Sequence, residues 1–143
     1  MYTLVASVVA RTTNDVLLVK EGKEEVQGTW NLPGGRVEED EDPSETAVRE
    51  VKEEVGVSVD LVGVVGIYLG QDAFVDGPFL SITYLGQLSG KPRAISTDTV
   101  EAVEWVNQQR LNELELRSPY VSRAIYDANE KTFSKDIIQF IIE

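Results

Sequence analysis

The chain has 143 residues and a formal net charge of −12, from 25 acidic and 13 basic side chains. This length suits a single domain, residues 1–143, built around one sizeable core. The negative charge argues against binding to the backbone of duplex nucleic acid, which needs a basic surface. The chain contains neither cysteine nor histidine, which excludes disulfides, thiol nucleophiles and the commonest general base. Any catalysis must therefore use carboxylates, metal ions and water.

The sequence shows neither a recognisable signal peptide nor a transmembrane segment. The amino-terminal segment lacks a basic region followed by a clear cleavage site. No apolar run approaches the roughly 18 residues of a membrane span. We therefore expect a cytoplasmic protein with no membrane partner.

Five segments are rich in β-branched and aromatic residues, and turns or polar loops separate them. They are predicted to be strands. Gly63 and Gly66 interrupt the third of them and are expected to allow a β-bulge. The five predicted strands are Thr3–Arg11, Val16–Lys20, Val57–Leu69, Phe79–Leu88 and Ala102–Val106.

The segment that follows Glu41 has the features of a capped helix. Asp42 is a suitable N-cap, Pro43 then takes the first helical position, and Glu45 completes a capping box. The helix is predicted to run to about Val55 and to stop at Gly56. At roughly 100° per residue, one arc of this helix faces a core. That arc contains Ala47, Val48, Val51 and Val55.

The other side of the same helix carries Glu50, Glu53 and Glu54. Their spacing brings three carboxylates together, which raises their pKa values and costs stability unless a cation lies among them. The surrounding segment from residue 38 to residue 54 holds nine acidic and two basic side chains. Oxygen ligands alone suit a hard cation, so a Mg²⁺ or Mn²⁺ site is predicted. The alternative is a solvated acidic helix face.

Two further helices are predicted near the carboxyl terminus, over Leu111–Leu116 and Pro119–Asn129. Ser118 caps the second, and its first position is a proline. The apolar tail Ile137–Ile142 is too short for its type to be assigned. The pattern indicates one α/β domain, in which the acidic helix packs against a sheet and the C-terminal helices cover its other face.

The acidic helix and the loop before it contain a longer pattern of fixed spacing. The pattern is G-x5-E-x7-R-E-U-x-E-E-x-G-U, where U is aliphatic, and it begins at Gly35 and ends at Val57. At every defined position this segment resembles the signature of the Nudix hydrolases. The resemblance implies an α/β/α sandwich with a mixed sheet and a loop-helix-loop that carries the site. The fixed residues are Gly35, Glu41, Arg49, Glu50, Glu53, Glu54 and Gly56.

The resemblance also implies roles for these residues. Metal coordination falls to Glu50, Glu53 and Glu54, while the turn at Gly35 brings the backbone close to a phosphate or a metal-bound oxygen. One carboxylate, for which Glu53 is our candidate, or a residue in a later loop would deprotonate the attacking water. In the family, Arg49 and Glu41 serve mainly as an internal ion pair that holds the loop on the helix.

Other residues are candidates for substrate contacts. Arg36 follows the glycines and could touch a phosphate, and Glu38 occupies a place where the family often has a glutamate near the metal. Trp30 could stack on a base or simply pack in the core, and Phe74 lies in the loop that often closes over the nucleoside. Glu101, four residues before Trp105, is the favoured distal acid, with Asp98 and Glu104 as alternatives.

The flanking segments narrow the prediction. Residues 29–42, 77–88, 103–106 and 116–125 resemble small bacterial Nudix phosphatases of the NudJ type, which act on nucleoside tri- and diphosphates and on a thiamin-precursor diphosphate. We therefore expect a small nucleotide or diphosphate substrate and a monomer or homodimer. Two alternatives stay open: a pyrophosphatase for ADP-ribose or another dinucleotide or nucleotide sugar, and a nucleotide-binding Nudix sensor without turnover.

Overall fold

The structure, a computed structural model, describes residues 1–71, 77–96 and 98–141. A four-stranded sheet with the order β4-β1-β6-β5 forms its centre. β1 runs parallel to β6, whereas β1–β4 and β5–β6 are antiparallel, so the sheet is mixed. The four strands are β1 (Thr3–Ala10), β4 (Gly34–Arg36), β5 (Val59–Gln71) and β6 (Pro78–Leu88).

A second, antiparallel sheet has three strands in the order β3-β2-β7. They are β2 (Val16–Glu21), β3 (Trp30–Asn31) and β7 (Val100–Val106). All five predicted strands are present, with ends that differ by at most two residues. The short strands β3 and β4 were not predicted, because two or three residues are too few to show a pattern of alternation.

β5 contains the irregularities that its glycines predict. Its register against β6 shifts between Leu61 and Gly63 and again between Val64 and Gly66. A β-carbon on Gly66 would come within 2.7 Å of the Tyr68 hydroxyl oxygen. The predicted bulges are therefore confirmed, and the second glycine leaves room for the Tyr68 side chain.

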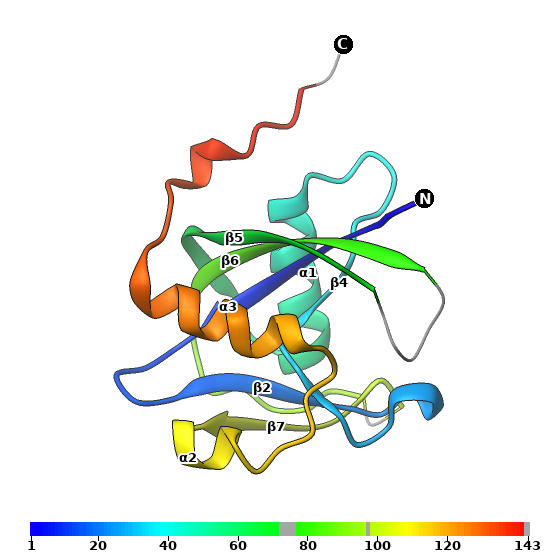
Figure 1. The fold of residues 1–143 in the computed structure, drawn as a ribbon, viewed down its shortest axis with the longest axis vertical. Coiled ribbons are helices and arrows are strands. Elements are labelled where there is room, and N and C mark those ends of the chain that lie inside the picture. Colours follow the sequence, from blue (N-terminus) through cyan, green and yellow to red (C-terminus); the bar gives the residue numbers. More distant parts are fainter. Residues whose placement is uncertain (72–76, 97, 142–143) are drawn as a thin grey trace.

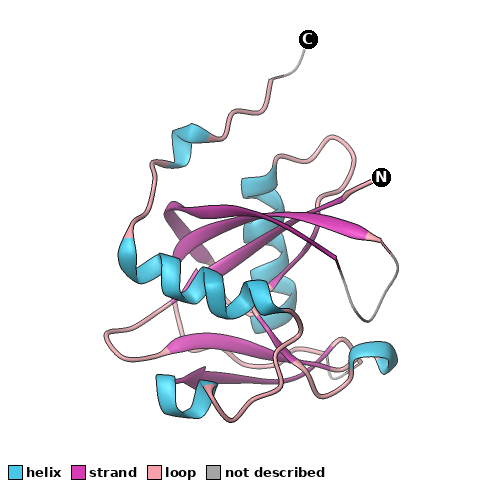
Figure 2. Ribbon diagram, viewed as in Figure 1, coloured by secondary structure: helices cyan, strands magenta, loops and turns pink. Residues whose placement is uncertain are grey.

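Two long helices cover opposite faces of the four-stranded sheet (Figure 1). Helix α1 (Pro43–Val55) packs its apolar residues with Ala6, Val8 and Ala10 of β1, while α3 (Pro119–Glu130) packs with the neighbouring Val9. Because alternate residues of a strand point to opposite faces, the two helices lie on the two sides of β1. Figure 2 shows the same helix, sheet, helix order. The predicted α/β/α sandwich is confirmed.

Two local predictions need correction, and the type of the unassigned tail is now defined. Helix α2 covers Gln108–Leu111, so the predicted helix at Leu111–Leu116 is wrong: Asn107 caps an earlier start, and Leu116 forms a bridge with Trp30. Val48 is 38% exposed and lies outside the core that α1 otherwise contacts. The apolar tail forms the 3-10 turn η2 (Lys135–Ile137) and then an irregular chain as far as residue 141, and another 3-10 turn, η1 (Glu24–Val26), follows β2.

No helix among the described residues combines the length and the hydropathy needed to cross a membrane.

Candidate active site

The start of α1 is fixed by its cap. The side chain of Asp42 accepts a hydrogen bond of 2.8 Å from the backbone N–H of Ser44, and Glu45 accepts one of 3.2 Å from the backbone N–H of Asp42. Gly56 ends the helix with a φ of 75°, in the left-handed region. The predicted cap, first turn and helix end are confirmed, so the positions of the glutamates along the helix are set by local interactions.

Two of the three glutamates lie against the glycine turn. The backbone N–H of Gly34 donates a hydrogen bond of 2.8 Å to Glu54 Oε1. A β-carbon on Gly35 would collide with the carboxylate of Glu50. β4 holds this turn in place through its pairing with β1. The absence of a side chain at position 35 therefore makes room for a carboxylate.

Arg49 connects the loop to the helix. Its Nε donates to Glu41 Oε2 at 2.7 Å and its Nη2 to Glu41 Oε1 at 3.0 Å, so the predicted ion pair is present and has the bidentate geometry of strong carboxylate recognition. Its Nη1 lies 2.9 Å from Glu50 Oε1 and 3.3 Å from Glu53 Oε2, and its Nη2 also donates to the Arg36 carbonyl. One guanidinium thus donates hydrogen bonds to three carboxylates.

The carboxylates of this cluster differ in their electrostatic surroundings. The hydrogen bonds from Arg49 and Thr46 lower the pKa of Glu41 to about 2. Burial, and then the charge of Glu53, raises the pKa of Glu50. Burial raises the pKa of Glu54 well above its usual range, with a smaller contribution from the charge of Glu50. Negative charge on Glu50 and Glu54 is therefore costly unless a cation compensates it.

The donor set at the glycine turn suits a hard divalent cation. It consists of carboxylate and backbone oxygens, and the collision that a β-carbon would make at Gly35 shows how closely Glu50 approaches the backbone. Within residues 1–71, 77–96 and 98–141, however, no three acidic side chains are arranged to hold an ion. Arg49 engages Glu50 and Glu53, whereas Glu54 accepts a hydrogen bond from Gly34. The metal assignment stays a prediction.

Only some of the residues predicted to contact the substrate lie near the glutamate cluster. Glu38 lies 3.8 Å from Arg49 at the edge of the cluster, and the side chain of Arg36 is exposed next to the turn. Trp30 is only 7% exposed and packs in the second core cluster, which favours the packing alternative over base stacking. Phe74 lies outside the described residues.

The predicted distal acid, Glu101, lies on the three-stranded sheet. Glu101 lies on β7 and forms a 3.4 Å ion pair with Lys20 of β2. That contact links two neighbouring strands rather than reaching α1. Its role as a distal acid has no support from this contact and stays a prediction.

Sequence reasoning missed three contributors to the cluster. Thr46 is fully buried and donates a hydrogen bond of 2.6 Å to Glu41. Glu21 and Lys23 lie close enough to influence the pKa of Glu54, in opposite directions. Thr46 has a signal in the sequence, since it is five residues after Glu41 on the inner side of a capped helix. Glu21 and Lys23 have none, because only the tertiary fold brings the end of β2 to the helix.

A mixed sheet between two helices, with an arginine-organised glutamate cluster held against a glycine turn, defines the Nudix type of domain. The family model of the NUDIX domain matches residues 1–127. The chain therefore belongs to the Nudix family.

Curated relatives carry several names. Putative nudix hydrolase 1 of Caenorhabditis elegans is 34% identical over 128 residues, which cover 86% of this chain and 34% of that protein. An ADP-ribose pyrophosphatase of Methanocaldococcus jannaschii is 34% identical over 89 residues, which cover 62% of this chain and 53% of that protein. A putative 8-oxo-dGTP diphosphatase of Bacillus subtilis is 34% identical over 112 residues, covering 78% and 70%. The chain spans about a third of the length of the Caenorhabditis elegans protein and about half of the length of the Methanocaldococcus jannaschii protein.

Solved structures share the fold over nearly the whole chain. A NUDIX hydrolase from Nitrosomonas europaea superposes with a TM-score of 0.89 at 25% identity, covering 99% of this chain and 98% of that one. The NUDIX domain of Shewanella oneidensis NrtR, complexed with ADP ribose, superposes with a TM-score of 0.76 at 22% identity, covering 91% and 88%. The second likeness shows the fold alone.

Proposed function

We propose that this domain hydrolyses a phosphoanhydride bond in a nucleoside tri- or diphosphate, or in a small organic diphosphate, with Mg²⁺ or Mn²⁺ as cofactor. The observation that carries the proposal is the position of Glu50 and Glu54, whose carboxylates lie against the Gly34–Gly35 turn with raised pKa values. Costly negative charge at an oxygen-rich turn is what a divalent cation relieves. Family membership supports the same class of reaction.

The proposal gives each residue of the cluster a distinct task. Glu50, Glu53, Glu54 and the backbone at Gly35 would hold the cation, which supplies charge neutralisation for the phosphates and lowers the pKa of bound water. Glu53 is the candidate base, since its side chain is 56% exposed and can reach a water molecule. Arg49 and Glu41 position the other carboxylates through the bidentate pair.

The proposed substrate must approach a chain with a net charge of −12. A polyphosphate would therefore arrive with its own cation, or meet an isolated base such as Arg36, which is exposed beside the turn. The name of the Bacillus subtilis relative, a putative 8-oxo-dGTP diphosphatase, supports a nucleoside triphosphate. The segment resemblance to NudJ-type phosphatases favours release of inorganic phosphate. A cytoplasmic location and a monomeric or homodimeric state stay predictions.

A second candidate function is hydrolysis of ADP-ribose. It is favoured by the Methanocaldococcus jannaschii relative, which is named an ADP-ribose pyrophosphatase. The two candidates share the cation site and differ in which phosphorus is attacked and which product leaves.

Product analysis separates these functions. The protein is incubated with Mg²⁺ or Mn²⁺ and one substrate at a time. The substrates are nucleoside di- and triphosphates, ADP-ribose, dinucleoside polyphosphates and a pyrimidine diphosphate. The released phosphate, diphosphate and nucleotides are each measured. Inorganic phosphate from nucleotides supports the leading proposal. AMP with ribose phosphate from ADP-ribose supports the second candidate. Tight nucleotide binding without any product would replace both with a sensor.

A further inference from the structure

Strand β5 forms one outer edge of the four-stranded sheet, and β4 with its glycine turn forms the other. The edge strands β3 and β4 are only two and three residues long, and the edge strand β7 carries Glu101 and Glu104. Short edges and charged edges discourage pairing with another chain. β5 has 13 residues, and residues 61–71 contain neither a charged residue nor a proline. Because both of its bulges precede Ile67, the end of β5 is the one edge among the described strands without such protection.

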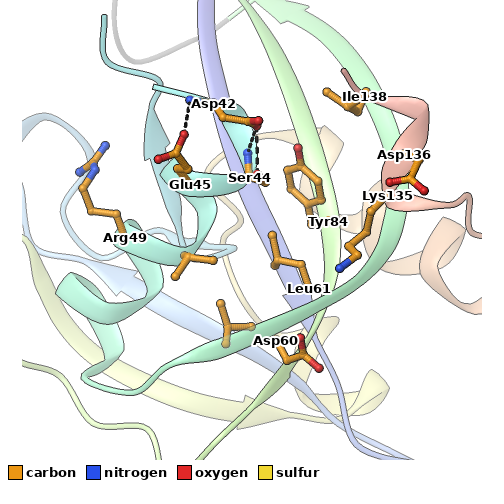
Figure 3. A pocket seen from close by; sticks show the side chains of 12 residues that line it. Asp42, Ser44, Glu45, Arg49, Asp60, Leu61, Tyr84, Lys135, Asp136 and Ile138 are labelled. Atoms are coloured by element: carbon orange, nitrogen blue, oxygen red, sulfur yellow. Dashed lines mark hydrogen bonds between the residues drawn. The ribbon is translucent and has the colours of Figure 1, made fainter. Parts of the chain in front are cut away.

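The chain that follows α3 covers only the first half of this edge. Phe133 exchanges two backbone hydrogen bonds of 2.8 Å with Val64. Residues 135–138 line one side of a cavity of about 720 Å³ that also reaches Leu61, near the start of the strand (Figure 3). Within the described residues, residues 67–71 have backbone partners only on β6. The second half of the edge is therefore open.

The pattern of hydrogen bonds determines which backbone groups of this half point outward. Along an antiparallel pair, residues bonded to the neighbouring strand alternate with residues whose N–H and C=O point away from it. Val64 points away from β6, because both of its groups bond Phe133, and the extra residue of the following bulge shifts the alternation by one. Pro78 lies opposite Gln71, which agrees with an outward Gln71, since a proline has no N–H to donate. The residues that present both groups outward are Ile67, Leu69 and Gln71.

One face of this open half is apolar. Ile67 and Leu69 are 56% and 64% exposed. Their partners on β6 are Ile82 and Leu80, which belong to the core on the α1 side of the sheet or pack against it. The two exposed side chains therefore extend the apolar face of the sheet up to its open edge, where burial against another strand would stabilise an association.

The open half is also complementary to itself. When a second, antiparallel copy is centred on Leu69, the two Leu69 residues lie opposite each other and Ile67 lies opposite Gln71 of the second copy. On the other face, Tyr68 lies opposite Gly70 of the second copy. An aromatic ring beside a cross-strand glycine is a favourable pair, because the ring covers backbone that has no side chain of its own.

We propose that two copies of this chain associate through this edge, with residues 67–71 of each copy paired antiparallel about a two-fold axis at Leu69. The outward groups of the two copies then form about six backbone hydrogen bonds and join the two sheets into one. The association does not depend on the proposed hydrolase function, because β5 and the glycine turn lie at opposite edges of the sheet.

The area and the charge of this contact determine its strength. Five paired residues and their side chains bury roughly 500 Å² per copy, which is less than the roughly 800 Å² per partner of a standard stable complex. Each copy has a net charge of −12, so the copies repel one another, although the contact strip itself is uncharged. We therefore expect a reversible dimer with a Kd on the order of 10⁻⁵ M that NaCl strengthens.

The test measures association and its location in the full chain. Sedimentation velocity between about 1 and 500 µM should show a monomer at the low end and a dimer at the high end. Amide hydrogen exchange at both ends of this range locates the contact. The N–H groups of Ile67, Leu69 and Gln71 should be protected only at high concentration. Those of Tyr68 and Gly70, which bond β6, should be protected at both.

Variants at the two-fold axis make the test specific. Leu69→Lys and Leu69→Glu each place like charges opposite one another and should raise the Kd at least about tenfold. An equimolar mixture of the two variants should associate again, because the introduced charges are then opposite. The matched control is Val62→Lys, at a residue of the covered half that is 44% exposed. It should dimerise like the wild type, and thermal melts verify that each variant is folded.

Three results would overturn the proposal. One is a monomer at every concentration up to about 500 µM, well above the expected Kd. Another is a dimer that Leu69→Lys weakens no more than Val62→Lys does, because a different surface would then form the contact. The third is protection of the Leu69 N–H that does not vary with concentration, since a segment of the same chain would then cover the edge.

Discussion

At the scale of single residues, Arg49 determines where the acidic side chains lie. Its planar guanidinium makes two parallel bonds to Glu41 and still reaches Glu50 and Glu53. A lysine at this position would offer one charged point and could not hold the loop and the helix at once. The fixed spacing of Glu41 and Arg49 in the sequence therefore corresponds to a physical connection between two segments.

Glu54→Gln separates the chemical role of this carboxylate from its structural role. The glutamine oxygen can still accept from the Gly34 N–H, so the fold should persist. Because burial raises the pKa of Glu54, removing its charge should leave Tm at neutral pH unchanged or higher. Turnover should fall by at least about 10²-fold, since a cation ligand is lost. Initial rates and a thermal melt provide both readouts, and near-wild-type turnover would contradict the metal assignment.

Glu41 should give the protein part of its sensitivity to acid. Its pKa is lowered from 4.5 to about 2 in the folded state, chiefly by Arg49. A lowered pKa means that the stabilisation is complete above the unfolded value and is lost as pH falls from 4.5 towards 2. Glu41→Gln should therefore flatten the decline of the unfolding free energy in this window, as measured by urea titrations at successive pH values.

The control for that experiment is Glu39→Gln, at an exposed residue of the same loop. Its pH profile should follow that of the wild type. Parallel profiles for Glu41→Gln and the wild type would show that the pair with Arg49 contributes nothing to acid stability.

At the scale of elements, α1 is the part of the fold that its sequence predicts most completely. The capping box, the proline and the final glycine all act within a few residues, so they can be read without a tertiary structure. The exception is Val48. Periodicity places it on the apolar arc, but residues 135–138 stand away from it and leave the cavity between them.

Asp42→Ala tests how much the cap of α1 contributes. The side chain accepts from the Ser44 backbone at 2.8 Å and from its hydroxyl at 3.0 Å. Losing these bonds should lower the free energy of unfolding by about 1 kcal/mol. Ser118→Ala, which removes the cap of α3, should cost a similar amount. Denaturant titrations measure both, and a wild-type midpoint for Asp42→Ala would contradict the assigned contribution.

The strands show which elements can be predicted from the residue pattern of the sequence and which cannot. β5 and β6 are long enough for their composition and glycines to reveal strands and bulges. β4 is only three residues long, and it is a strand because it pairs with β1. That pairing joins residues that lie far apart in the sequence. The same applies to residues 112–116, where a bridge between Leu116 and Trp30 prevails over local helix propensity.

At the scale of the whole molecule, the net charge of −12 makes stability depend on the ions in solution. NaCl should raise Tm by screening the repulsion. MgCl₂ at equal ionic strength should raise it further, because an ion bound only to the folded state contributes about 2.7 kcal/mol at a hundredfold excess over its Kd. Differential scanning fluorimetry at matched ionic strength measures the difference.

The variant Glu54→Gln serves as the control for this measurement. It should retain the NaCl response, which depends on the total charge, and lose most of the additional Mg²⁺ response. Equal melting curves in the two salts for the wild-type protein would argue against a specific divalent site.

The sequence by itself determined the capped helix, the order of its glutamates, the long strands and the family signature, because each is encoded by spacing within a few tens of residues. Only the tertiary structure decided that Trp30 is buried and that Glu101 pairs with Lys20. It also decided that Glu21 and Lys23 approach Glu54, and that Tyr84 faces a cavity. These facts depend on how separate elements meet, and packing between elements leaves no periodic trace in the chain.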